Sequence, residues 1–229
     1  MTSQSRTVPA ILGALAVPLA MAPAAEAAGP RSQPAASYYV EARGGLNLLS
    51  DPTFAYTPTG GTKASGKASV GTGLLVGAAA GVRLQDRFRL EAEYLYRANS
   101  LSSVAVPQFA GVNDGDFNSV VIAANAYYDY GGWAVASGRL RPYVGVGLAY
   151  VQELDTDLKA PGRPALQFSN DRFGYQLLAG ANLEWTSGLY VGAGVRYTAA
   201  GKAKLTGSAG TLETDYKPIA VTASLGYRF

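Results

Sequence analysis

The sequence predicts an all-β fold: an eight-stranded antiparallel up-and-down transmembrane β-barrel. Three observations support this prediction. Apolar and polar residues alternate with a period of two in eight segments, which is typical of strands with one face toward lipid and one toward water. The connections between these segments are short on one side and long on the other. The last segment ends on an aromatic residue, Phe229, with an apolar residue at every second position before it.

The first four predicted strands cover residues 38–49, 73–84, 88–97 and 117–130. The third is the clearest example, because its two faces differ completely in character. Its apolar face carries Phe88, Leu90, Ala92, Tyr94 and Tyr96. Its other face carries Arg89, Glu91, Glu93, Leu95 and Arg97. Such a division predicts a strand in a wall between two different environments.

The second half repeats the pattern in residues 142–153, 173–184, 189–197 and 216–229. Each of the eight segments has at least about nine residues, which is enough for a tilted strand to cross the hydrocarbon layer. No stretch after the N-terminal region has about eighteen consecutive apolar residues, so helical membrane spans are not expected.

The connections alternate in length, as in transmembrane up-and-down barrels. Residues 85–87 and 185–188 form tight turns and 131–140 a moderate one. The other connections are long, rich in turn-forming residues and predicted to be loops, near residues 50–72, 98–116, 155–170 and 200–215. An even number of strands places both termini on the short-turn side, which would be the periplasm, with the four long loops outside the cell.

The N-terminal region has the features of an export signal. Arg6 precedes an apolar run over residues 8–22, and Ala25-Glu26-Ala27 has the small-x-small form of a cleavage site. We therefore expect a signal peptide over residues 1–27 and a single barrel domain over residues 28–229. A retained helical anchor is the alternative, although the run is short for a membrane span and contains prolines.

Composition narrows the range of functions. The chain has 229 residues and contains neither Cys nor His. Disulfides, thiolate metal sites and Ser-His catalysis are therefore unavailable, and no enzymatic activity, cofactor or metal is expected. The formal net charge of +3 is small. In the absence of a basic block, nucleic acid is not an expected partner.

Alternation alone allows two kinds of closed barrel. A soluble lipocalin-like barrel would place the apolar face inward around a ligand. The chain lacks the helix and disulfide of that class, and its aromatic residues gather near the two ends of the strands, as at lipid–water interfaces. The apolar face is therefore predicted to meet lipid and the charged face to fill the interior.

The inward face is predicted to be lined by ion pairs, because an unpaired ion out of water is costly. Its predicted cations are Arg43, Arg83, Arg89, Arg97, Arg196 and Arg228. Its predicted anions are Glu41, Glu91, Glu93, Asp129, Glu153 and Glu184. The interior of an eight-stranded barrel is just wide enough for side chains to fill. Equal numbers of the two signs favour a sealed interior over a selective pore.

The strand pattern, the segments Asn125–Tyr130 and Pro142–Gly147 and the Tyr227-Arg228-Phe229 ending together resemble the opacity-type, OmpA-like small outer-membrane barrels of Gram-negative bacteria, a porin-type family of surface proteins. The resemblance implies an outer-membrane location and contact with outer-membrane lipid or lipopolysaccharide. It also implies dependence on periplasmic chaperones and on the barrel assembly machinery. The implied C-terminal assembly signal consists of Val221, Ala223, Leu225, Tyr227 and Phe229.

Three functions stay open at this point. We expect a structural and surface-interaction protein whose four long loops meet host or envelope ligands, because loops on a rigid scaffold are where such function concentrates. A narrow porin-like channel for small solutes and a binder of small apolar molecules are the alternatives. The pair Glu91 and Glu93 suggests glycosidase carboxylates, but interior ion pairing explains both residues better. Paired aspartates at 114 and 116 or at 155 and 157 are explained better as solvated loop residues than as a cation site.

Overall fold

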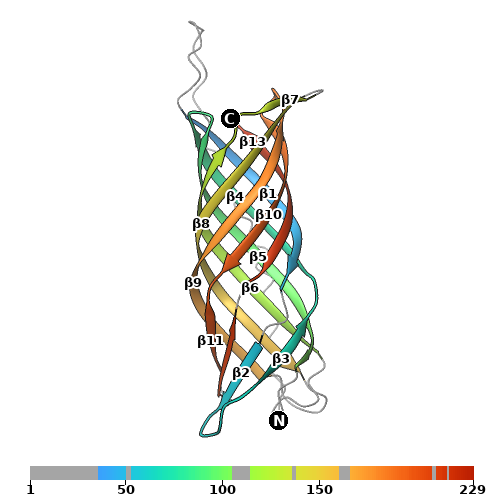
Figure 1. Cartoon of the computed structure of the whole chain (residues 1–229), viewed down its shortest axis with the longest axis vertical. Coiled ribbons are helices and arrows are strands. Elements are labelled where there is room, and N and C mark those ends of the chain that lie inside the picture. Colours follow the sequence, from blue (N-terminus) through green and yellow to red (C-terminus); the bar gives the residue numbers. More distant parts are fainter. Residues whose placement is uncertain are drawn as a thin grey trace, which may run out of the picture. The chain divides into compact units, whose positions relative to one another are not determined.

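Eight long antiparallel strands form the barrel in the computed structural model (Figure 1). The structure describes residues 36–49, 53–104, 114–135, 138–159, 166–207, 210–215 and 217–229. The barrel strands are β1 (Ala36–Leu48), β4 (Gly73–Leu84), β5 (Phe88–Val104), β6 (Asp114–Asp129), β8 (Gly138–Lys159), β9 (Leu166–Glu184), β10 (Leu189–Ala199) and β13 (Ile219–Arg228). The predicted signal peptide lies outside the described residues and stays a prediction.

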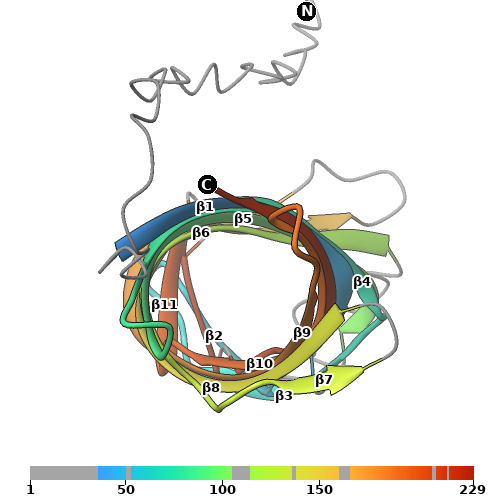
Figure 2. The ribbon, with the colours of Figure 1, turned by 90° about the horizontal axis from the view of Figure 1, so that it is seen from above.

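The strands follow one another around a closed ring (Figure 2). Each of them pairs with the next barrel strand along the chain, and β13 closes the ring by pairing with both β10 and β1. Closure leaves no free edge in the ring, which satisfies the backbone hydrogen bonds that lipid cannot satisfy. The predicted all-β fold with an eight-stranded closed barrel is confirmed.

The expected long loops are wrong over much of their length, because four of the barrel strands extend into them. β5 and β6 remain paired as far as Leu101↔Gly115, and β8 and β9 as far as Leu158↔Leu166. The physical reason is that a ladder continues while both strands tolerate extended backbone, whether or not the side chains still alternate in polarity. The loss of alternation between apolar and polar residues marks the edge of the lipid-facing band, but the β-strands continue beyond that edge.

Short strands fill the remaining gaps at this end of the barrel. They are β2 (Thr53–Pro58), β3 (Ala64–Val70), β11 (Lys202–Gly207) and β12 (Gly210–Asp215). β3 pairs with β5, β2 with β3 and β12, and β11 with β12 and, at Thr206↔Ser169, with β9. With the outer parts of β5, β6, β8 and β9 they complete a second ring, which we call the extension. We call this end of the barrel the extended end.

The opposite end, which we call the short-turn end, has tight connections. Gln85 and Asp86 both have positive φ, +49° and +57°, in the three-residue connection between β4 and β5, where the N–H of Arg87 donates to the carbonyl of Leu84 at 3.1 Å. Gly188 has a φ of +88° in the turn between β9 and β10, where an added Cβ would lie 2.4 Å from the carbonyl oxygen of Arg228. A short strand, β7 (Trp133–Val135), pairs with the beginning of β8.

The outer surface of the barrel carries a band of exposed apolar side chains. On β8 the exposed residues are Val144, Val146 and Leu148, and the same face continues through half-buried side chains to Leu140, which lies opposite Trp133, and to Tyr150. These roughly ten residues, at about 3.3 Å each and a tilt of about 40°, span about 25 Å, which is the height expected for a lipid-facing band. The part of the chain that the structure describes contains no helix long and apolar enough to cross a membrane.

Candidate functional site: side chains inside the barrel

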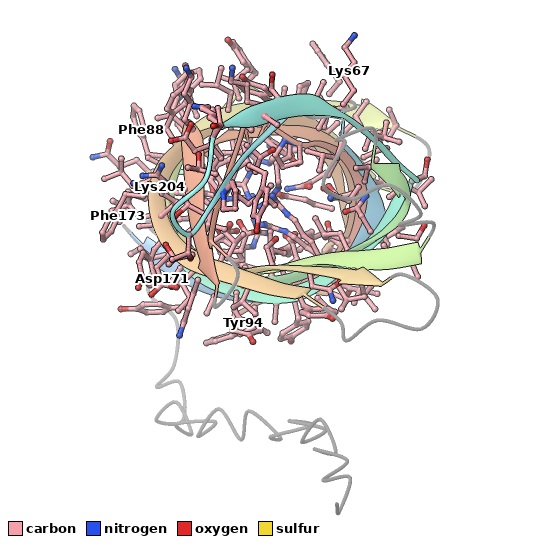
Figure 3. The ribbon with its side chains drawn as sticks, turned by 90° about the horizontal axis from the view of Figure 1, so that it is seen from below. Lys67, Phe88, Tyr94, Asp171, Phe173 and Lys204 are labelled. Carbon is pink, nitrogen blue, oxygen red and sulfur yellow. The ribbon has the colours of Figure 1, made fainter. Side chains whose placement is uncertain are left out.

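The barrel is filled by side chains that point inward from all eight strands (Figure 3). Of the twelve charged residues predicted for the interior, ten are buried: Glu41, Arg43, Arg83, Arg89, Glu91, Glu93, Arg97, Asp129, Glu184 and Arg196. Arg228 is half-buried at the short-turn end, with 30% of its side chain exposed. The side chain of Glu153 lies outside the described part of the chain. The interior side chains form layers along the barrel axis.

The central layer is built around Arg43 of β1. Its Nη1 and Nη2 donate to the two carboxylate oxygens of Glu91 at 3.0 and 2.7 Å. Nη1 also lies 3.0 Å from Oε2 of Glu93, and Nε contacts Glu41. One guanidinium group therefore contacts three carboxylates from β1 and β5, and it binds one of them, that of Glu91, in a bidentate manner.

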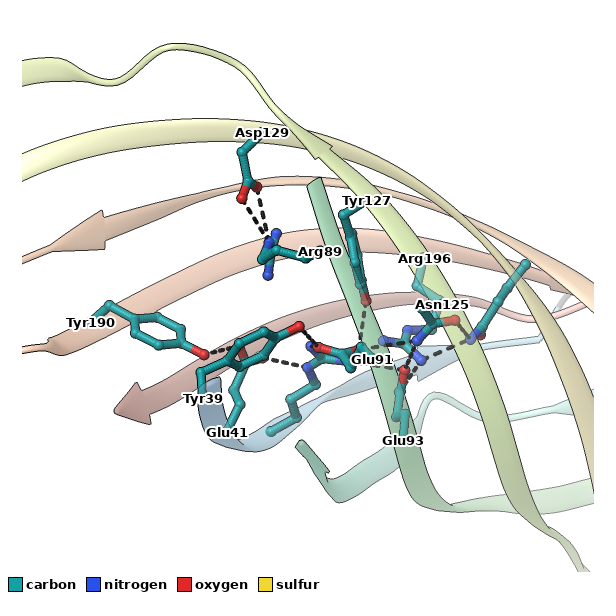
Figure 4. A network of polar contacts seen from close by, with 12 residues as sticks. Tyr39, Glu41, Arg89, Glu91, Glu93, Asn125, Tyr127, Asp129, Tyr190 and Arg196 are labelled. Atoms are coloured by element: carbon teal, nitrogen blue, oxygen red, sulfur yellow. Dashed lines mark hydrogen bonds and ion pairs between the residues drawn. The ribbon is translucent and has the colours of Figure 1, made fainter. Parts of the chain in front are cut away.

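Amide side chains and a second arginine complete this central layer (Figure 4). Nδ2 of Asn125 donates to Glu91 at 3.1 Å and to Glu93 at 2.6 Å, and its Oδ1 accepts from Nε2 of Gln176 at 2.6 Å. Arg196 of β10 contacts Glu93 and donates to Oε1 of Gln176 at 3.3 Å. The network thus joins strands on opposite sides of the barrel, and it holds three carboxylates and two guanidinium groups together away from water.

Four tyrosines form a layer on the short-turn side of the central layer: Tyr39, Tyr127, Tyr143 and Tyr190. Each stands directly opposite a glycine on a neighbouring strand, in the pairs Tyr39↔Gly81, Tyr127↔Gly145, Tyr143↔Gly180 and Tyr190↔Gly226. A Cβ built on each of these glycines would lie between 2.1 and 2.6 Å from its tyrosine ring or hydroxyl. The glycines therefore make room for the rings.

The tyrosine layer is tied to the charges on both of its sides. The hydroxyls of Tyr39 and Tyr127 donate to Glu91 at 3.0 and 2.8 Å. On the other side, the guanidinium carbon of Arg89 lies 4.4 Å from the ring centroid of Tyr127 and 4.9 Å from that of Tyr143. Arg89 thus sits on the aromatic layer, where a cation over a ring is favourable.

The short-turn end holds a second charged layer, which we call the mouth cluster. Arg89 Nε donates to both oxygens of Asp129, at 3.0 and 2.9 Å. Glu184 accepts contacts from three arginines: Arg83 Nη2 at 2.6 Å, Arg141 Nε at 3.0 Å and Arg228 Nη1 at 3.2 Å.

Sequence reasoning missed Arg141, because the predicted strand began at residue 142. Arg141 lies two positions before Tyr143 and four before Gly145, so it falls on the same face of an extended strand as these two residues, opposite to the apolar face of Pro142 and Val144. Continuing the alternation backward by one inward position would have found it.

Apolar side chains also lie inside the barrel, and the sequence analysis named only one of them, Leu95, on the inward face. Leu75, Leu95 and Val121 are at most 1% exposed and lie on the extended side of the central layer. Beyond them, Asn47 Nδ2 donates to Asn99 Oδ1 at 2.6 Å, and Arg97 Nη2 donates to Thr198 Oγ1 at 2.9 Å. Leu95 lies on the inward face that the alternation predicts, so the alternation itself indicated that an apolar side chain enters the barrel. The interior is therefore partly apolar rather than charged throughout.

The predicted C-terminal assembly residues all point outward from β13. Val221, Ala223, Leu225, Tyr227 and Phe229 are exposed, toward the space that lipid would occupy. The ring of Phe229 stacks on those of Tyr38 and Tyr227, with both centroid distances 6.4 Å. β13 joins the first barrel strand to the seventh, so these residues lie where the ring closes.

The geometry of the interior suits packing and charge compensation. Within the described ranges, no group of three or more His, Cys, Asp or Glu side chains is arranged to hold a metal ion. The carboxylates contact arginine, amide or tyrosine donors at hydrogen-bonding distance. Such an arrangement joins all the strands through side chains as well as through the backbone ladder.

Comparison with known proteins places this geometry in a family. Residues 12–229 match the family described as Outer membrane protein beta-barrel domain. A comparison with curated proteins gives no match. The resemblance to small outer-membrane barrels of OmpA-like and opacity type is confirmed.

Solved outer-membrane barrels are similar in fold. OprG from Pseudomonas aeruginosa is 17% identical, with 84% of this chain and 96% of that chain covered and a TM-score of 0.62. Neisserial surface protein A is 20% identical, with 85% and 99% covered and a TM-score of 0.50. A major outer membrane protein from Thermus thermophilus is 14% identical, with 85% and 100% covered and a TM-score of 0.51. At these identities the likeness concerns the fold alone.

Proposed function

Because the chain belongs to the family of outer membrane protein β-barrel domains and lies in the outer membrane, we propose that it is a sealed anchor that presents the extension as a surface for interaction. The observation that carries this proposal is the filled interior. The tyrosine layer, the central layer and the apolar residues Leu75, Leu95 and Val121 follow one another along the axis from the short-turn end. A solute would have to displace several packed layers to cross.

The extension supports the second half of the proposal. Eight strand segments close it through backbone hydrogen bonds, so it is a scaffold rather than a set of independent loops. Its exposed lysines belong to the wall made by β2, β3, β11 and β12 with the segments that flank them: Lys63, Lys67, Lys202, Lys204 and Lys217. Lys67 and Lys204 project outward in Figure 3. Such a wall suits anionic groups of lipopolysaccharide or of a partner.

The proposal places the short turns in the periplasm and the extension outside the cell. The C-terminal residues of β13 would then be read in the periplasm by chaperones and by the barrel assembly machinery before insertion. Absence of Cys from the chain makes single-cysteine labelling a direct test. Lys67→Cys in the extension should react with an impermeant maleimide on intact cells, and Ser187→Cys in a short turn only after permeabilisation. The reverse pattern would refute this orientation.

Conductance in planar lipid bilayers tests the seal against the alternative of a narrow porin-like channel. We expect no steady conductance from the native barrel. A variant that removes apolar side chains from the interior, Leu75→Gly with Leu95→Gly, should conduct if those layers form the seal. Leu90→Gly, on the lipid-facing side of the same strand as Leu95, is the matched control and should stay closed. Steady conductance of the native protein would overturn the proposal in favour of the channel.

A further inference from the structure

The mouth cluster carries more positive than negative charge. Four guanidinium groups share two carboxylates: Arg83, Arg89, Arg141 and Arg228 surround Asp129 and Glu184. A further carboxylate, that of Asp86, has a side chain that is 43% exposed and lies 3.8 Å from Arg141. It therefore contributes little to compensation, because water screens it.

Two of these arginines face each other across neighbouring strands and share a single carboxylate, that of Asp129, whose Oδ2 lies 3.4 Å from Nε of Arg83 and 2.9 Å from Nε of Arg89. Arg83 of β4 lies directly opposite Arg89 of β5 in the ladder, and like charges in this position repel. Both side chains are more than nine-tenths buried. Nη1 of Arg83 and Nη2 of Arg89 have no hydrogen-bond acceptor, although a buried donor is normally paired.

Arg141 brings a third cation to the same place. It shares the carboxylate of Glu184 with Arg83, at 3.0 and 2.6 Å, and is itself more than nine-tenths buried. A water molecule could accept a hydrogen bond from these donors, but it would leave the surplus charge uncompensated away from bulk water. An anion would satisfy both the donors and the charge.

We propose that the mouth cluster binds a small tetrahedral oxyanion of the phosphate type between Arg83, Arg89 and Arg141. Three buried guanidinium groups linked through Asp129 and Glu184, two of them with an Nη that lacks an acceptor, suit an acceptor with several oxygens. The half-buried Arg228, at the rim of the barrel, gives access from the aqueous phase at the short-turn end. The tyrosine layer beneath Arg89 closes the floor, with ring centroids 4.4 to 5.7 Å from its guanidinium carbon. The site is therefore closed on the side of the tyrosine layer, and an anion bound there would not cross the barrel.

The site goes beyond the proposed function, because it lies at the opposite end from the extension and does not depend on whether the barrel conducts. Equilibrium dialysis with radiolabelled inorganic phosphate tests it, with the full barrel domain refolded in non-ionic detergent. We expect saturable binding of one phosphate per barrel. Removal of one charged hydrogen-bond donor should weaken binding roughly tenfold or more, so Arg83→Gln and Arg141→Gln should both raise the dissociation constant by that factor.

Two exposed arginines at the same end provide matched controls, Arg87 and Arg139. Their change to Gln removes the same charge from the surface and should alter phosphate affinity less than about twofold, because solvent screens exposed charges. A folded barrel changes its electrophoretic mobility when the sample is heated, so a comparison of heated and unheated samples on a gel verifies that each variant is folded. Two interior variants are compared, so if one of them does not fold, the phosphate affinity of the other still tests the proposed site. Absent or unsaturable binding, binding that survives both interior changes, or equal loss in the surface variants would each overturn the proposal.

Discussion

Replacement of Val146 by arginine tests which face of the strands meets lipid. Val146 of β8 points outward, is 58% exposed and pairs with Ala126 and Leu177 on the neighbouring strands. It stands roughly four residues from Tyr150, or about 10 Å along the membrane normal for a tilt of about 40°. A cation at that depth in the apolar band should cost about 2–4 kcal/mol of unfolding free energy.

Reversible unfolding in urea, with the barrel refolded into phospholipid vesicles, measures this cost. Val135→Arg is the matched control, because Val135 also points outward and is exposed but lies on β7, beyond Trp133 and at the edge of the band. Near the interface the same charge should cost at most about 1 kcal/mol. Equal stability of the two variants, or no loss in Val146→Arg, would refute the assignment of this face to lipid.

Three further predictions concern the interior and the extension. Arg43→Gln should lower the unfolding free energy by about 3–5 kcal/mol in the same assay, because three carboxylates lose a shared cation; a loss below about 1 kcal/mol would contradict this. Gly226→Ala should cost about 1–3 kcal/mol, since its Cβ would lie 2.1 Å from the tyrosine ring opposite, whereas Gly131→Ala, with open space around it, should be nearly neutral. Lys63 donates to Glu213 at 2.6 Å in the extension and holds the pKa of that carboxyl below its usual range. The pair therefore stabilises the extension above the ordinary carboxyl pKa and loses this effect as the pH falls through the lowered value. Lys63→Ala should raise the pKa of Glu213 in a carbon-13 titration, and an unchanged titration would contradict the pairing.

The alternation of the sequence was sufficient for the membrane-spanning part of the fold. The second predicted strand, residues 73–84, has the same bounds as β4 in the structure. Its alternation could be read because lipid and the filled interior demand opposite side chains at successive positions. The third strand likewise begins at Phe88, as predicted from the same pattern.

The alternation of apolar and polar residues is weaker in the extension. Its outer face carries exposed polar residues such as Lys67 and Lys204, while its inner face buries both apolar and polar residues, such as Leu212 and Thr214, so the period-two difference in polarity is smaller. The sequence therefore predicts loop where the structure has strand β3, Ala64–Val70, and strand β12, Gly210–Asp215. Their pairing depends on neighbours distant in sequence, which no local pattern records.

In the interior, too, the sequence predicts which face of a strand a side chain lies on but not which residues it contacts. Parity alone placed Arg89, Glu91 and Glu93 on one face, and by continuation it would have placed Arg141 there. It could not say that Arg43 would hold three carboxylates. Those contacts depend on how far each strand is staggered against the next around the ring.

By itself, the sequence determined that the chain forms a barrel of eight strands with an apolar outer face and a polar inner face, because the period of two is a property of each strand alone. Only the tertiary structure decided which charges meet, that four tyrosines stand opposite four glycines, that arginines outnumber carboxylates in the mouth cluster, and that the strands continue as an extension. Closure of the ring sets the register and stagger of all the strands together, and these features follow from that register.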